Sequence, residues 1–184
     1  MKRRMCAQLI AVMLMACGVC FAAKLYTGKA SLCGIRINDT FTSVFQRYGR
    51  AYQNTTISEM ENTHALIYND PKIDAQIIIT CGAHPFPGIA KAKVDGIFLK
   101  RGRYMGKKYL ANTSFAKMGT AEGIALGATK REILQKYPDA RFFMEGRNER
   151  GSTYLGNDKN GYAIDYEFTL RKGILSEVSH ASSQ

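Results

Sequence analysis

The sequence contains no tryptophan and only four prolines among its 184 residues. The low proline count, together with 17 glycines, excludes a collagen-like or low-complexity chain. The missing tryptophan excludes little, because ten tyrosines and nine phenylalanines can fill a core. With 46% hydrophobic residues the chain is too apolar to be disordered, and its length suits one ordinary domain or two small ones.

Sequence motifs of several enzyme classes are also missing. No G-x-S-x-G, H-E-x-x-H or glycine-rich phosphate-binding loop occurs. Cys33 could formally act as a nucleophile with one of the three histidines as its base, but nothing in the sequence positions the two groups. Cys81 and His84 form a lone C-x-x-H, which is half of a zinc site at most. We therefore predict a protein without catalytic residues, metal or cofactor.

Acidic residues are scarce as well: 15 Asp and Glu stand against 26 Lys and Arg, a formal net charge of +11. Residues 1–22 start with three basic residues, continue with an apolar run and end in small residues, which is typical of a secretory signal peptide. The run is shorter than the about 20 apolar residues that cross a bilayer. We expect a mature chain that is basic and has no transmembrane span.

Two routes of processing remain open. Small residues at positions 20 and 22 suit cleavage after Ala22, whereas residues 14–17 (LMAC) resemble a lipobox that would leave a lipidated Cys17 at the new N-terminus. The expected location is the periplasm or the exterior, with a lipid anchor in the outer membrane as the alternative.

Cleavage after Ala22 leaves two cysteines, Cys33 and Cys81. Two thiols in an exported protein predict one disulfide bond, which would stabilise the fold by about 4 kcal/mol in the chain-entropy model. Two buried free thiols are the alternative.

A pattern repeats at a spacing of 89 residues. Residues 34–49 (GIRINDTFTSVFQRYG) and 123–138 (GIALGATKREILQKYP) align without a gap. Each copy predicts a short apolar entry, a turn and a helix. Thr129 and Glu132 form a capping box in the second copy, and Asp39 or Thr40 can cap the first. The internal repetition favours a duplicated module.

Strands are predicted after each helix. Residues 162–170 alternate between apolar and polar side chains, which predicts a strand. Residues 171–173 (RKG) predict a turn into a second strand at 174–180, and residues 152–155 provide the preceding strand. In the first copy, the corresponding predicted strands are residues 64–68, 73–80 and 92–99. We expect an α+β fold of two tandem repeats, each a short helix packed on an antiparallel meander. The boundaries are a signal peptide (1–22), a linker (23–33), a first repeat (34–118) and a second repeat (119–184).

The two copies, with their Gly-Ile entry and a helix that ends at Tyr-Gly or Tyr-Pro, resemble a group of exported bacterial modules. This group includes tandem-repeat proteins like the β-lactamase inhibitor protein and small lipoproteins of outer-membrane assembly. The resemblance implies a non-catalytic binding or assembly role at the bacterial envelope. It concerns the fold, and no binding residue is carried over from it.

Two segments are candidate contacts with a partner. In residues 83–88 (AHPFPG) two prolines restrain the backbone around Phe86, beside His84, which would present the aromatic ring as an anchor; an ordinary loop with Phe86 folded onto the core is the alternative. The second segment is a run with interleaved tyrosines, in which the candidate contacts are Lys100, Arg101, Arg103, Tyr104, Lys107 and Lys108. A solvated strand edge is its alternative reading.

Asp165 and Glu167 lie two apart on a predicted strand, so their carboxylates share one face. The alternation places that face toward solvent, which favours a structural role over catalysis.

We predict an exported, non-catalytic protein-binding module, an inhibitor or an accessory of envelope assembly, with an envelope or extracellular protein as partner and no nucleic acid. The alternative is a binder of anionic envelope surfaces (lipid, lipopolysaccharide or peptidoglycan) through the basic run.

Overall fold

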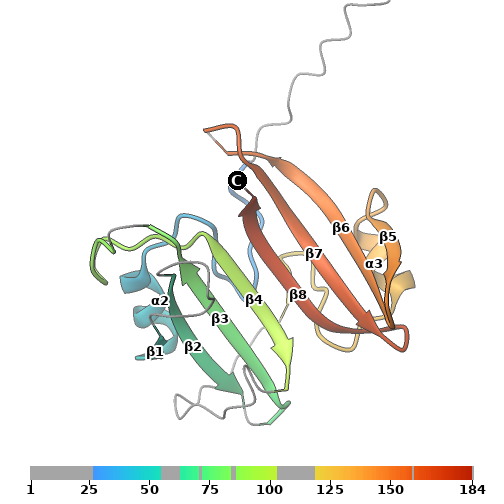
Figure 1. Cartoon of the computed structure of the whole chain (residues 1–184), viewed down its shortest axis with the longest axis horizontal. Helices are drawn as coiled ribbons and strands as arrows, with labels where there is room; N and C mark the ends of the chain where they lie inside the picture. The colour runs from blue at the N-terminus through green and yellow to red at the C-terminus, as the bar shows by residue number, and fades with distance from the viewer. Residues whose placement is uncertain are drawn as a thin grey trace, which may run out of the picture.

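A computed structural model describes residues 27–54, 63–70, 72–83, 86–102, 119–158 and 160–183. These residues form a single antiparallel sheet of eight strands in the order β1-β2-β3-β4-β8-β7-β6-β5, together with two short helices (Figure 1). The strands are β1 (Tyr52–Asn54), β2 (His64–Asp70), β3 (Ala75–Cys81), β4 (Gly96–Arg101), β5 (Arg141–Glu145), β6 (Asn148–Asn157), β7 (Ala163–Arg171) and β8 (Ile174–Ser183). The helices are α2 (Phe41–Tyr48) and α3 (Lys130–Lys136).

The predicted fold class was wrong. We expected an α+β protein of two tandem repeats, each with its own helix and meander. The structure instead has one continuous, β-rich sheet in which β4 pairs with β8, from Gly96 opposite Ala181 to Lys100 opposite Glu177. Each helix is only two turns long, so the sheet dominates. Unpaired backbone groups at a strand edge favour pairing with another strand, and this pairing joins the two groups of strands.

Both helices have the local chemistry that the sequence predicts. The Thr40 side chain accepts a hydrogen bond from the Ser43 backbone N–H and caps α2. Thr129 and Glu132 form the predicted capping box at the start of α3. The first helix ends at Gly49, whose φ of 77° is accessible to glycine at little cost. The described helices are too short to cross a membrane.

One hydrophobic core underlies the whole sheet. Phe41 and Val44 of α2 and Ile133 of α3 belong to the same buried cluster as the inward-facing side chains of both groups of strands. The helices therefore lie on one face of the sheet, at opposite ends of it (Figure 1). On the other face, Ala65, Ile67 and Ile78 form a small second cluster over β2 and β3.

The segment before α2 is attached to the far half of the sheet. The Ser31 N–H donates to the hydroxyl of Tyr166 at 2.9 Å, and that hydroxyl donates to the Ser31 carbonyl at 2.8 Å. The Cys33 N–H donates to the Gly119 carbonyl at 2.8 Å. These contacts link residues that are far apart in sequence and hold the beginning of the described chain against β7.

We expect Tyr166→Phe to lower the free energy of unfolding by about 1–3 kcal/mol, because it leaves backbone groups of Ser31 without their buried partner. Tyr154→Phe, at an exposed tyrosine of β6, is the matched control and should change stability little. Urea unfolding of both variants measures the difference. Equal stability of the two variants would contradict the role given to Tyr166.

Candidate functional site

Several of the predicted partner contacts lie outside the described residues. These are His84, Arg103, Tyr104, Lys107 and Lys108, and the candidate lipidation residue Cys17 lies outside them as well. Phe86, Lys100 and Arg101 are described, so the structure bears on these three.

Phe86 packs inward instead of projecting from its loop. Its ring stacks on the His64 ring, with centroids 3.6 Å apart and an interplanar angle of 18°. It also lies 6.4 Å from the Phe41 ring and contacts the edge of the main core. This packing corresponds to the alternative, a loop with Phe86 folded onto the core, because burying the apolar ring against α2 and β2 is more favourable than exposing it to water. A contact of Phe86 with a partner stays a prediction.

The predicted Cys33–Cys81 disulfide is not formed. Both cysteines are free and buried, and both belong to the main core. Burial raises the pKa of the Cys33 thiol to about 12, so the thiol stays protonated at neutral pH. A protonated, buried thiol is a poor nucleophile and a poor metal ligand. The described residues contain no group of three or more His, Cys, Asp or Glu side chains that could hold a metal ion.

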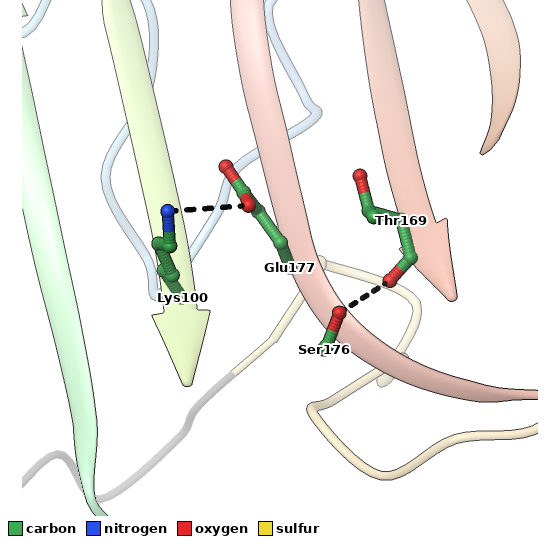
Figure 2. A network of polar contacts seen from close by, with 4 residues as sticks. All are labelled: Lys100, Thr169, Ser176 and Glu177. Carbon is green, nitrogen blue, oxygen red and sulfur yellow. Dashed lines mark hydrogen bonds and ion pairs between the residues drawn. The ribbon is translucent and has the colours of Figure 1, made fainter. Parts of the chain in front are cut away.

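The two described residues of the basic run face different surroundings. The Lys100 ammonium lies 3.8 Å from the carboxylate of Glu177 on β8, while the neighbouring Ser176 hydroxyl donates to the Thr169 carbonyl at 3.0 Å (Figure 2). Lys100 is thus partly neutralised across the joint between β4 and β8. Arg101, the last residue of β4, lines a pocket instead.

This pocket lies where β4 ends beside the turn between β7 and β8. It encloses about 360 Å³. Three of its lining residues are cationic and the others are small or apolar: Arg101, Gly102, Arg171, Lys172, Ile174, Leu175 and Ser176. We call Arg101, Arg171 and Lys172 the basic triad. The sequence indicated Arg101 as a contact, but it indicated Arg171 and Lys172 only as part of a turn.

The second candidate surface is the face of β5, β6 and β7 opposite the helices. Buried Ile164, Tyr166 and Phe168 point to the core, so the alternating side chains of β7 point the other way. The register continues this face onto β6 and β5. Its main side chains are Arg141, Phe143, Arg150, Ser152, Tyr154, Asp165 and Glu167, and we call it the open face.

The open face carries large side chains that are not buried. Phe143 is 58% exposed and Tyr154 is 46% exposed. Tyr154 borders a shallow pocket of about 380 Å³, which it shares with Asp139, Arg141 and Ser152. The aromatic residues here are backed by paired strands, so their backbone is held in place by the sheet. Sequence reasoning missed them because β5 shows no alternation of apolar and polar residues that would distinguish an inward from an outward face.

Asp165 and Glu167 lie on the open face, as the alternation predicts. Asp165 is half-buried and Glu167 is exposed. Partial burial, and secondly the negative charge of Glu167, raise the pKa of Asp165 from 3.8 to about 6. The buried ring of His180 on β8 lies on the other side of the strand pair, with Nδ1 3.0 Å from the Asp165 carbonyl oxygen. Burial lowers the pKa of His180, so the ring is neutral at pH 7.

Comparison with known proteins finds no family model, no curated protein and no solved structure that matches this chain. The inference of function therefore depends on the sequence and on the two surfaces described above.

We expect Asp165→Asn to stabilise the protein at pH 7 but not at pH 3.5. The pKa of Asp165 is about 6 in the folded protein, which is higher than in the unfolded chain. Its contribution to folding stability is therefore most favourable below about pH 4 and is lost as the pH rises to about 6. After allowance for solvent screening we expect about 1 kcal/mol, or a rise of about 2–4 °C in Tm. Thermal melts at both pH values measure it, and an equal shift at both would contradict the raised pKa.

We expect Cys33 and Cys81 to react slowly with iodoacetamide in the folded protein and rapidly in denaturant, because folding buries both thiols. Mass spectrometry of the peptides that contain each cysteine, after short alkylation pulses without reductant, measures both rates. A disulfide-linked pair of these peptides would show that the bond forms after all.

Proposed function

We propose that this protein is an exported, non-catalytic binding module that captures a protein partner on the open face of β5, β6 and β7. The observation that carries the proposal is the pair of exposed aromatic side chains, Phe143 and Tyr154, on a face that the described helices leave uncovered. Its role would be that of an inhibitor or of an accessory in envelope assembly.

The composition of the open face supports a protein partner. Energetically dominant residues of protein interfaces are enriched in tyrosine, tryptophan and arginine, and phenylalanine is also enriched in interfaces. Tyr154 and Arg141 line one pocket, and Phe143 follows Arg141 by two residues on the same strand face. Because paired strands hold these residues, binding would order few additional backbone torsions.

Charged side chains surround the aromatic pair. Arg150 forms an ion pair with Glu145 across β5 and β6, whereas Asp165 and Glu167 repel each other on β7. A partner with an apolar centre and a cationic group opposite Asp165 and Glu167 would complement this arrangement. Such a partner would also hold Asp165 in its ionised form.

The free edge of β5 adds a second means of contact. Among the described strands, β5 is the last of the sheet and pairs only with β6. Gly151 of β6 leaves space for the Phe142 ring, since an added Cβ there would overlap that ring. Phe142 therefore anchors β5 to the core while Phe143 points outward. An extended segment of a partner could pair with this edge by β-augmentation.

A role in the envelope or outside the cell follows from the signal-peptide pattern of residues 1–22. Whether processing occurs after Ala22 or at Cys17 decides between a soluble and a lipid-anchored form. The open face would serve either form, because it belongs to β5, β6 and β7, which neither route of processing removes.

Binding of anionic envelope surfaces is the second candidate function. The observation that favours it is the basic triad, which brings Arg101 of the basic run together with two cations from the turn between β7 and β8. Attraction to a charged surface weakens with salt, whereas capture by aromatic side chains persists.

A pull-down tests the main proposal. Protein with a C-terminal affinity tag is incubated with envelope extract at about 0.15 M and about 0.5 M salt. We expect a protein partner whose capture persists at the higher salt and falls at least tenfold in the Phe143→Ala/Tyr154→Ala variant, as expected for removal of two dominant contacts. Tyr162→Ala is the matched control, since Tyr162 is 41% exposed in the loop before β7 and lies off the open face.

Equal capture by the double variant and the unchanged protein would exclude the open face. Recovery of lipid or glycan without a protein would favour the second candidate function instead. Loss of capture in the Tyr162→Ala control as well would show that the effect is not confined to the open face, which would also contradict the proposal.

A further inference from the structure

The basic triad brings together three cations that lack acidic partners among the described residues. Those residues form ion pairs between Lys100 and Glu177, Lys130 and Glu149, and Arg150 and Glu145. Glu177, the acidic residue on the neighbouring part of β8, is thus engaged by Lys100. The pocket at the end of β4 therefore holds uncompensated positive charge.

Lys172 has a backbone conformation that a lysine adopts at a cost. Lys172 and Gly173 both have positive φ, 53° and 77°, and together form the two-residue turn between β7 and β8. Asparagine or glycine is preferred at the first position of such turns, and other residues adopt it at a cost. A lysine in this position places an ammonium group at the rim of the pocket, where an asparagine would make a better turn.

We infer that this pocket binds a phosphate group, either free or as the headgroup of an anionic lipid. Two guanidinium groups offer paired donors that match phosphate oxygens, and the ammonium group adds a third positive charge. Three cations match a phosphate that carries more than one negative charge better than they match a single carboxylate. The phosphate group is the shared chemistry of both sources.

The rest of the pocket suits this ligand. Ile174 is 39% exposed and, with Leu175, adds apolar residues to the lining of the pocket. Gly102 presents no side chain, so a ligand can approach the backbone there. A volume of about 360 Å³ lies within the range of small-molecule sites and exceeds what a bare phosphate ion fills.

The guanidinium of Arg101 reaches across the joint between the two groups of strands. Its Nη2 lies 3.7 Å from the position that a Cβ on Gly127 would occupy, next to the chain that enters α3. Gly127 in turn donates its N–H to the Leu175 carbonyl at 2.9 Å. The cation from β4 is therefore held against the same segment that forms the wall of the pocket.

This inference deepens the second candidate function. Arg171 lies on the same side of β7 as Asp165 and Glu167, but the pocket includes neither Phe143 nor Tyr154, on which the main proposal depends. It differs from the basic surface that the sequence predicted, since Lys100 pairs with Glu177 and the triad takes two of its members from a turn far along the chain. The two proposals can therefore fail separately.

Titration with inorganic phosphate at constant ionic strength tests the site, with Tm and calorimetry as readouts. A ligand that binds the folded state raises Tm with its concentration. We expect Lys172→Asn to weaken phosphate binding about tenfold, the effect of losing one charged hydrogen bond. Without phosphate, the Tm of the Lys172→Asn variant should equal or exceed that of the unchanged protein, because asparagine suits the turn. Arg101→Gln/Arg171→Gln/Lys172→Asn should abolish binding. Lys91→Gln is the charge-matched control for the single variant, and Lys29→Gln/Lys91→Gln/Lys93→Gln is the one for the triple variant, since these lysines are exposed and lie outside the pocket.

Vesicles of phosphatidylglycerol with phosphatidylcholine, and poly-glutamate as an acidic polypeptide, form the other arms. Vesicle binding that the triple variant loses and Lys29→Gln/Lys91→Gln/Lys93→Gln keeps supports the inference with a lipid as the source of the phosphate, even if free phosphate binds weakly. Vesicle binding that the triple variant keeps but that added salt removes would contradict phosphate binding in this pocket. It would still agree with the second candidate function. Triad-dependent binding of poly-glutamate alone, or no binding in any arm, would also overturn it.

Discussion

The pairing of β4 with β8 is the constraint on which the rest of the structure depends. Each of these strands would otherwise end its group of four with a row of unpaired backbone groups, and their ladder turns two edges into the centre of one sheet. Gly96 begins the ladder at a position where an added Cβ would lie 2.6 Å from the Thr80 hydroxyl oxygen. A side chain there would force the Thr80 hydroxyl, which donates to Asp95 Oδ1, to move.

The joint also creates the surfaces with which the protein can bind. The basic triad exists only because the end of β4 lies beside the turn between β7 and β8, so a residue from one group of strands meets two from the other. The sheet places both helices on one face, which leaves the opposite face of β5, β6 and β7 accessible. Over β2 and β3 the same face is buried around Ile67 and Ile78.

Local features were predictable because they depend on neighbouring residues. The predicted first helix coincides with α2, and the capping box of Thr129 and Glu132 is present at α3. The turn at Arg171, Lys172 and Gly173 connects β7 and β8 as expected. Features that depend on distant partners were not predictable. Alternation shows that a strand has an inner face, but it does not show which strand lies beside it, so the continuous sheet was missed. Counting cysteines likewise could not show that Cys33 and Cys81 remain free in the core.

The sequence by itself determined the two capped helices, the inward face of β7, the basic charge and the pattern of an exported chain, because each depends on composition or on residues a few positions apart. The tertiary structure decided that two groups of strands form one sheet, that Phe86 faces inward, and that Arg101 meets Arg171 and Lys172. The physical reason is that strand pairing and burial satisfy backbone groups and apolar surface through partners many residues away, and a linear pattern does not specify these partners.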